Sequence, residues 1–197
     1  MNADLLIIMA RYPTLGRVKT RLAAEIGARP AVEVYRELLR HHAREFADAP
    51  FPVEWRYTPA RSPFRRIAGA GARLRPQPEG SLGRRMATIF RESFAGGCGR
   101  VVMIGTDSPE MEQGTVRRAF RLLRSHPAVF QPTLDGGYAL IGLREMLPVF
   151  EGIDWSTSQV MDQTRRRLRR LDVNHAELPV TFDIDTPDDL ARWRKRS

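Results

Sequence analysis

The sequence of 197 residues contains one cysteine, Cys98, so no disulfide can form within the chain. Its apolar runs are all much shorter than the ~20 residues that cross a bilayer. The N-terminal stretch MNADLLIIMARYP has an acidic residue before its short apolar run and no basic segment, so we expect no signal peptide. These absences favour a cytoplasmic protein with no membrane partner.

Lysine is also scarce: Lys19 and Lys195 are the only two among 32 Lys and Arg residues. The formal net charge of +9 favours anionic partners such as phosphates, nucleotides or nucleic acid. The arginine run at 165–170 argues little for nucleic acid, because an apolar stripe on the same predicted helix leaves these arginines on the outer, solvated face. We therefore expect no nucleic-acid partner.

The sequence has no repeats and no low-complexity linker, which predicts a single domain over residues 1–197. Strand-like and helix-like segments alternate along it. Strands are predicted at 5–10, 53–60, 73–77, 101–105, 128–132, 138–143 and 175–179, and helices at 21–27, 30–49, 82–94, 112–125, 156–171 and 186–196. This order predicts an α/β three-layer sandwich, whose sheet is mixed but mostly parallel because 128–132 and 138–143 read as an antiparallel pair.

The loop after the first strand, RYPTLGRVKTRL, is rich in cations. Arg11, Arg17, Lys19 and Arg21 lie near the start of the next helix, and Gly16 lets the backbone approach a ligand closely. Cations beside a helix N-terminus form a binding site for anions. The spacing of a Walker A loop is absent. A basic surface loop is the alternative interpretation.

The stretch VVMIGTDSPEM, 101–111, delivers a carboxylate, Asp107, to the tip of a buried strand. Ligands of open α/β sheets bind outside the carboxyl ends of strands, so Asp107 is a candidate ligand for Mg²⁺ or Mn²⁺. The alternative is that Asp107 or Ser108 only caps the following helix.

The segment FDIDTPDDL places Asp183 and Asp185 two residues apart, so both carboxylates can face one ion if the segment is extended. Two like charges held together are costly unless a cation compensates them. Capping of the last helix is the alternative. We expect Thr186 to be its N-cap.

The segment LDGGY, 134–138, adds Asp135 beside Gly136, Gly137 and Tyr138. The glycines permit close passage of a sugar or base, although a plain hairpin turn explains them as well. Trp155 can stack on a sugar or base, or it can be a residue of the core.

Six segments together resemble one known family, DUF2064, over nearly the whole chain. They are RYPTLGRVKTRLA, GSLGRRM, VVMIGTDSP, LDGGYALIGL, FEGIDWSTSQV and DIDTPDDL, in the order found in that family. The family is also labelled as glycosyltransferases associated with arsenosugar biosynthesis or with radical-SAM/selenodomain genes. The resemblance implies the glycosyltransferase-A, or nucleotide-diphospho-sugar transferase, fold, which nucleotidyltransferases share.

The resemblance also implies roles for residues. Asp107 would bind a divalent metal, Mg²⁺ or Mn²⁺, with further contacts from Asp183 and Asp185. The first loop would hold the nucleotide through Ala10, Arg11, Gly16, Lys19 and Arg21. The sequence departs from the family at GSLGRRM, where Ser81 and Arg84 stand in a segment that often carries an acid. It also lacks the G-G-x-x-x-R-M loop of many nucleotidyltransferases, which favours glycosyl transfer.

The expected function is therefore metal-dependent transfer of a sugar from a nucleotide sugar to a small-molecule acceptor. Lys19 would stabilise the charge of the leaving diphosphate, and Asp135 would be the base for the acceptor hydroxyl. Gly136, Gly137, Tyr138 and Trp155 would contact the substrate. One alternative is a nucleotidyltransferase that couples an NTP to a small phosphorylated or carboxylate acceptor. Another is an inactive anion- or RNA-binding protein of the same fold.

Overall fold

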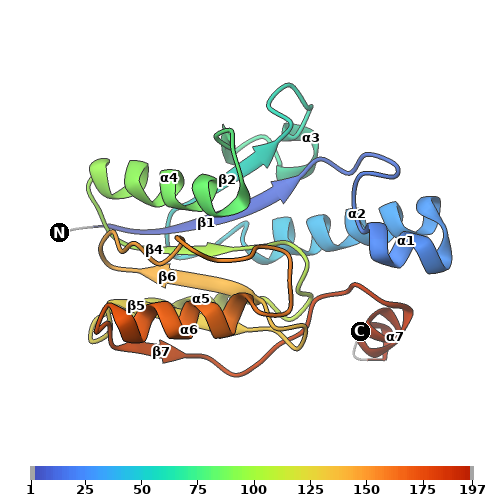
Figure 1. The fold of residues 1–197 in the computed structure, drawn as a ribbon. Helices are drawn as coiled ribbons and strands as arrows, with labels where there is room; N and C mark the ends of the chain where they lie inside the picture. Colours follow the sequence, from blue (N-terminus) through green and yellow to red (C-terminus); the bar gives the residue numbers. More distant parts are fainter. Residues whose placement is uncertain (1–2, 196–197) are drawn as a thin grey trace.

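A computed structural model of the chain describes residues 3–195, which form one sheet with helices on both faces (Figure 1). The strands are β1 (Ala3–Arg11), β2 (Val53–Thr58), β3 (Arg73–Pro76), β4 (Cys98–Ile104), β5 (Ala128–Pro132), β6 (Tyr138–Leu143) and β7 (His175–Glu177). The helices are α1 (Thr20–Ile26), α2 (Ala28–Glu45), α3 (Arg65–Ala68), α4 (Leu82–Ala95), α5 (Gln113–Leu122), α6 (Val160–Arg170) and α7 (Pro187–Arg194).

Within these residues the sheet has seven strands in the order β3-β2-β1-β4-β6-β5-β7. Strand β6 runs antiparallel to its neighbours β4 and β5, and all other neighbouring pairs are parallel. The predicted mixed, mostly parallel sheet is thus confirmed, including the antiparallel pair around the DGG turn.

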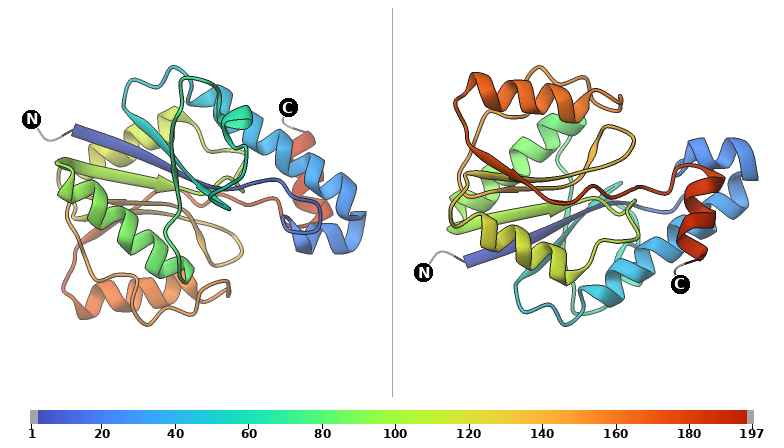
Figure 2. Two further views of the ribbon diagram at one scale, coloured as in Figure 1. Left: turned by 90° about the horizontal axis from the view of Figure 1, so that it is seen from above. Right: turned by 90° about the horizontal axis from the view of Figure 1, so that it is seen from below.

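The two faces of the sheet carry separate hydrophobic cores. On β1, Leu6 and Ile8 pack with residues of α2 and α5, whereas Leu5 and Ile7 pack with residues of α4 and α6. Figure 2 shows these two helix pairs on opposite sides of the sheet. Because successive strand side chains point to opposite faces, the continuous apolar run of β1 serves both layers. The three-layer prediction is confirmed.

Some predicted boundaries were wrong. Helix α2 begins at Ala28, so Pro30 is its third residue, and it ends at Glu45 rather than near 49. Strand β4 begins at Cys98 rather than 101. The glycines at 96 and 97 lie immediately before it.

The start of α6 was also predicted wrongly. The helix begins at Val160 rather than at 156, and its N-cap is Gln159. Ser156 has φ +66, and the Thr157 hydroxyl donates a hydrogen bond to the Asp154 carbonyl. This local hydrogen bond competes with the helix, which begins only at Val160.

The last helix begins as predicted. Thr186 is the N-cap of α7, Pro187 is the first helical residue, and the Asp189 side chain completes a capping box. Between residues 3 and 195, no helix has both the length and the apolar character needed to cross a bilayer.

Candidate active site

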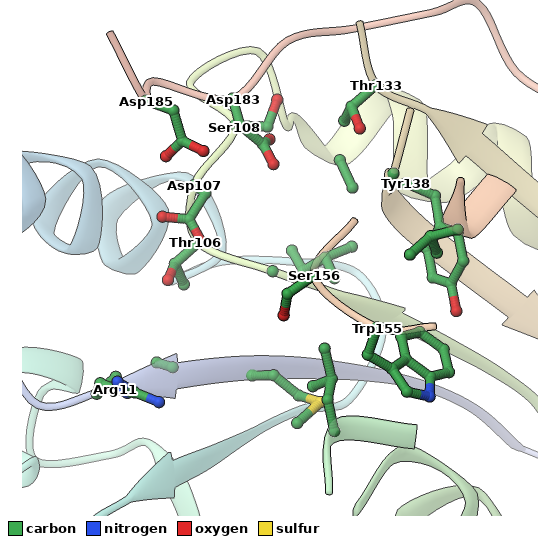
Figure 3. Close-up of a pocket in the computed structure, with 18 of the residues that line it drawn as sticks. Arg11, Thr106, Asp107, Ser108, Thr133, Tyr138, Trp155, Ser156, Asp183 and Asp185 are labelled. Atoms are coloured by element: carbon green, nitrogen blue, oxygen red, sulfur yellow. The ribbon is translucent and has the colours of Figure 1, made fainter. Parts of the chain in front are cut away.

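A cleft of about 920 Å³ opens where β1, β2 and β4 end (Figure 3). Most of the residues that the sequence singled out line it: Ala10, Arg11, Lys19, Arg21, Asp107, Asp135, Gly137, Tyr138, Trp155, Asp183 and Asp185. Gly16 and Gly136 are not part of the lining. The carboxyl ends of parallel strands meet at one edge of a sheet, which is why segments distant in sequence converge here.

Lys19 is the most enclosed charged residue of the cleft. Its side chain is only 2% exposed, and its Nζ lies 2.5 Å from Asp107 Oδ1 and 3.5 Å from Asp185 Oδ1. Burial alone lowers the pKa of Lys19, but the negative charges of Asp107 and Asp185 outweigh burial, so the net pKa is raised. Lys19 is therefore a buried ammonium ion that bridges two of the predicted metal-binding carboxylates.

The loop that carries Asp107 is fixed from both sides. Before it, the Thr106 hydroxyl lies 3.0 Å from the Tyr35 hydroxyl of α2, and both side chains are buried. The Asp107 carbonyl accepts a hydrogen bond of 3.0 Å from the Ile184 N–H. This backbone contact holds the segment of the two late aspartates beside the tip of β4.

The capping interpretation of Asp107 and Ser108 was wrong. The N-cap of α5 is Glu112, several residues further on, and it makes no side-chain cap. Ser108 is buried instead, and its hydroxyl lies 3.1 Å from the Thr181 hydroxyl. The Asp107 carboxylate is consequently free of a helix-capping role and contacts the ammonium of Lys19.

Asp183 has an unusual environment. Its Oδ1 is buried and has no hydrogen-bond partner among residues 3–195. Burial, together with the negative charge of Asp107, raises the pKa of Asp183 to about 8. Neither Asp183 nor Asp185 caps α7, since Thr186 does so. A buried carboxylate that lacks a partner fits a cation as its missing counterpart.

Asp185 completes the acidic group. Its Oδ2 accepts a hydrogen bond of 3.2 Å from the Arg21 guanidinium, while its Oδ1 faces Lys19. Figure 3 shows Asp107, Asp183 and Asp185 near one another at one side of the cleft. Within the described residues no group of three or more His, Cys, Asp or Glu side chains is placed so that it could hold a metal ion. Mg²⁺ sites commonly use one or two carboxylates and add water and substrate phosphates.

The first loop is folded against α2. The Arg11 N–H donates to the Tyr35 hydroxyl at 3.1 Å, and the Arg11 guanidinium donates to the Arg17 carbonyl at 3.1 Å. Gly16 has φ +70, a conformation that suits glycine, and it shapes the loop from outside the cleft. Sequence reasoning missed Tyr35. The only indication of this residue in the sequence is a hydroxyl group within the apolar stripe of the predicted helix.

The DGG segment forms the hairpin turn between β5 and β6. Asp135 Oδ1 accepts hydrogen bonds from the Thr133 hydroxyl at 2.5 Å and from the Gly137 N–H at 3.1 Å. Gly136 has φ +89, and a Cβ there would lie 2.0 Å from the Ser158 carbonyl oxygen. The hairpin interpretation is correct for Gly136, and the same turn brings Asp135 to the cleft.

Trp155 forms part of the opposite wall with Tyr138 (Figure 3). The two rings lie 6.3 Å apart between centroids and are nearly perpendicular, at 86°. Trp155 also packs against Phe150, and its indole covers Gly83 of α4. It is thus both a packed residue and a lining residue.

A further group that sequence reasoning missed joins the end of β1 to α4. Gln77 donates from Nε2 to the carbonyls of Ala10 and Arg56, both at 3.0 Å. Arg85 donates to the Gly80 carbonyl at 2.8 Å and to Gln77 Oε1 at 3.4 Å. The available signal was the GSLGRRM segment, which contains Arg85.

Ser81 and Arg84, at which GSLGRRM departs from the family, lie at the start of α4. Ser81 is the N-cap, and its hydroxyl accepts a hydrogen bond of 3.4 Å from the Arg84 N–H. Ser81 therefore provides a helix cap at the rim of the cleft.

Residues 42–157 match the model of a family described as "Uncharacterized protein conserved in bacteria (DUF2064)". No curated protein sequence matches the chain. A crystal structure from Desulfovibrio desulfuricans G20, provisionally named a nucleotide-diphospho-sugar transferase, is 30% identical with a TM-score of 0.88. The match covers 94% of this chain and 84% of that one.

Two more distant structures share the fold. CMP:2-keto-3-deoxy-manno-octonic acid synthetase complexed with CTP is 13% identical with a TM-score of 0.63, over 99% of this chain and 98% of that one. Rv0371c of Mycobacterium tuberculosis H37Rv, in complex with manganese, is 16% identical with a TM-score of 0.60, over 100% of both chains. At these identities the likeness concerns the fold alone.

Proposed function

The chain belongs to the DUF2064 family, and from this premise we propose that it is a metal-dependent glycosyltransferase with a nucleotide-sugar donor and a small-molecule acceptor. The observation that carries the proposal is the convergence of Lys19 with Asp107, Asp183 and Asp185 in one cleft. This set of charges suits a diphosphate held with a divalent metal better than it suits an uncharged ligand.

The three carboxylates are assigned to Mg²⁺ or Mn²⁺ bound together with substrate phosphates, because among residues 3–195 they do not form a metal site by themselves. The fit rests on the buried Asp183 Oδ1, which has no hydrogen-bond partner among residues 3–195, and on Asp107 and Asp185, whose side chains are 49% and 31% exposed. Rv0371c, which shares the fold, was found in complex with manganese. When bound, the metal would supply positive charge that stabilises the departing diphosphate.

The nucleotide is assigned to the first loop and the end of β1. Ala10, Arg11, Lys19 and Arg21 line the cleft there, and Gly16 shapes the loop. Lys19 is the catalytic cation in this proposal, because its ammonium can donate to the leaving diphosphate as charge develops on it.

The acceptor is assigned to the wall formed by the hairpin and Trp155. The acceptor hydroxyl oxygen forms a bond to the anomeric carbon, the bond from that carbon to the diphosphate breaks, and Asp135 takes the hydroxyl proton. Both hydrogen bonds to Asp135 engage Oδ1, so Oδ2 is the proposed proton acceptor. Gly137, Tyr138 and Trp155 would contact the sugar or acceptor, and Gly136 would shape the turn.

Nucleotidyl transfer is the second candidate. One observation favours it: the fold matches a CTP-bound synthetase over 99% of this chain. A phosphate or carboxylate acceptor is already nucleophilic, so positioning and charge neutralisation could suffice without Asp135.

A thermal-shift screen tests the proposal. Nucleoside triphosphates, their nucleotide sugars, the free nucleosides and a short RNA are each added with EDTA, Mg²⁺ or Mn²⁺. Glycosyl transfer predicts that one nucleotide sugar raises the melting temperature more than its parent triphosphate, and only with metal. Preference for the triphosphate would instead support nucleotidyl transfer. Stabilisation by RNA, and by no nucleotide, would support the inactive binding protein.

Product analysis then separates the two reactions. A glycosyltransferase releases a nucleoside diphosphate, whereas a nucleotidyltransferase releases pyrophosphate. With the preferred donor and a mixture of small hydroxyl and phosphate acceptors, release of pyrophosphate alone would overturn the primary proposal.

A further inference from the structure

We propose that the ammonium of Lys19 occupies the metal position in the free protein and moves to the nucleotide phosphates when metal and nucleotide bind. Divalent metal would then bind strongly only together with nucleotide. This inference rests on the proposed function and concerns the order in which its ligands are bound.

The ammonium of Lys19 contacts the carboxylates that are assigned to the metal. Its Nζ is 2.5 Å from Asp107 Oδ1 and 3.5 Å from Asp185 Oδ1, so it bridges two of the three assigned ligands. Metal-to-oxygen distances are about 2.0–2.6 Å for Mg²⁺ and Ca²⁺. A metal bound to the same carboxylates would lie within a few Å of the ammonium, and the repulsion between the two positive charges would favour departure of Lys19.

The negative charge of the neighbouring carboxylates explains why the ammonium lies there. Asp107, Asp183 and Asp185 place three carboxyl groups together, and such a group is costly without compensation. The Lys19 side chain is 2% exposed, so the ammonium is held by these carboxylates rather than by water. A divalent metal would neutralise the same carboxylates. The electrostatic attraction that holds the Lys19 ammonium there would then be weakened.

Lys19 is able to leave without unfolding its helix. It is the N-cap residue of α1, but its side chain makes no cap hydrogen bond, and the cap contact is its carbonyl oxygen, which accepts from the Ala23 N–H. Its backbone has φ 48 and ψ 46, a left-handed conformation that is unusual for a lysine. The cleft next to it, about 920 Å³ in volume, offers room for a phosphate and for the displaced side chain.

Arg21 provides a matched comparison. It pairs with Asp185 at 3.2 Å from the solvent side, with a side chain that is 63% exposed. Removing Arg21 subtracts the same single positive charge as removing Lys19 but leaves the bridging ammonium in place. The two variants therefore separate occupation of the metal position from a general effect of charge.

The first experiment measures binding of Mn²⁺ to the full chain without nucleotide, by electron paramagnetic resonance, for wild type, Lys19→Met and Arg21→Met. A site that must first be vacated has its apparent affinity reduced by the fraction that is vacant, so Lys19→Met should bind Mn²⁺ roughly tenfold or more tightly. Arg21→Met should gain clearly less. Equal gains in the two variants, or no gain in Lys19→Met, would overturn the inference.

The second experiment needs no variant at the site. Because Lys19 and Lys195 are the only lysines, protein made with lysine labelled at ¹³Cε gives two lysine signals, assigned with Lys195→Arg. Mg²⁺ together with the preferred nucleotide should shift the Lys19 signal strongly and leave that of Lys195 unchanged. The nucleotide without Mg²⁺ should shift it less.

The outcomes distinguish the two levels of proposal. A stationary Lys19 signal in a protein that binds nucleotide in the presence of Mg²⁺ would overturn the exchange and leave the proposed function intact. Failure of wild type to bind any nucleotide or nucleotide sugar with metal would overturn both.

Discussion

The indole of Trp155 lies directly on the backbone of Gly83. A Cβ on Gly83 would be 2.4 Å from Trp155 Nε1, closer than any side chain can approach. Through this contact the loop before α6 packs against the first turn of α4, and both elements line the cleft. Gly83 of the GSLGRRM segment thus allows Trp155, which is distant in sequence, to pack closely on α4.

Gly83→Ala should displace Trp155 and destabilise the protein by about 1–3 kcal/mol, the usual cost of overpacking a packed site. Chemical denaturation followed by tryptophan fluorescence measures this free energy of unfolding. Gly114→Ala in α5 is the control, because a Cβ there meets no atom of residues 3–195 within 4 Å. Since alanine favours helices over glycine, the control should be neutral or stabilising. A loss as large in Gly114→Ala as in Gly83→Ala would contradict the explanation.

Asp107→Asn should abolish the effect of Mg²⁺ or Mn²⁺ on nucleotide binding. The amide loses the charge that attracts the metal while keeping nearly the same shape. Isothermal titration of the nucleotide with and without metal measures the effect. Asp48→Asn, an exposed aspartate outside the lining of the cleft, should retain full metal dependence. A similar metal dependence in Asp107→Asn and wild type would refute the metal assignment of Asp107.

Lys19→Ala should weaken binding of a nucleoside diphosphate by roughly tenfold or more, the equivalent of about 1.4 kcal/mol or greater. The parent nucleoside, which has no phosphate, should bind to the variant and to wild type almost equally. Competition titrations with the two ligands provide the ratio. Equal losses for both ligands would show that Lys19 acts on the fold of the cleft rather than on phosphate.

The raised pKa of Asp183 makes stability and metal binding depend on pH in opposite ways. In the presence of EDTA the folded protein holds the proton of Asp183 up to about pH 8, whereas the unfolded chain releases it near 3.8. The contribution of Asp183 to stability is therefore complete below pH 3.8 and is lost as pH rises to about 8. Metal binding needs the ionised carboxylate, so it should strengthen as pH rises through the same range.

Asp183→Asn should remove both trends, because its side chain does not titrate. Melting temperatures in EDTA at pH 6 and pH 9 should differ more for wild type than for the variant. The melting temperature of wild type should be lower at pH 9 than at pH 6. Mg²⁺ titrations at the two pH values complete the comparison. A pH dependence that is identical in wild type and variant would show that Asp183 is not the titrating group.

The sequence predicted the architecture because its signals are local. The apolar run of β1, the amphipathic patterns of α4 and α5, and the Thr186 cap each depend on residues near one another in the chain. Boundaries were less accurate where polar side chains compete with the helix. At 156–159 the Thr157 hydroxyl bonds to the Asp154 carbonyl and postpones α6.

Much of the candidate site was also predictable, because parallel strands bring their carboxyl ends to one edge. The positions of Asp107, Lys19 and Asp185 after different strands were enough to expect them together. For Gly136 the sequence left two interpretations open, close contact with a ligand or a hairpin turn. The close approach of its backbone to Ser158 is explained by the turn.

By itself, then, the sequence determined the order of the strands and of the helices except the short α3, which was not predicted. It also determined the mixed sheet and the charges that meet at its edge, since periodicity and strand ends are local features of the chain. Only the tertiary structure decided which of these charges pair. Three features depend on distances between segments remote in the chain: the burial of Lys19 against Asp107, the lack of a hydrogen-bond partner for Asp183 Oδ1 among residues 3–195, and the packing of Trp155 on Gly83. Those distances are set by how the layers pack, and no local pattern encodes them.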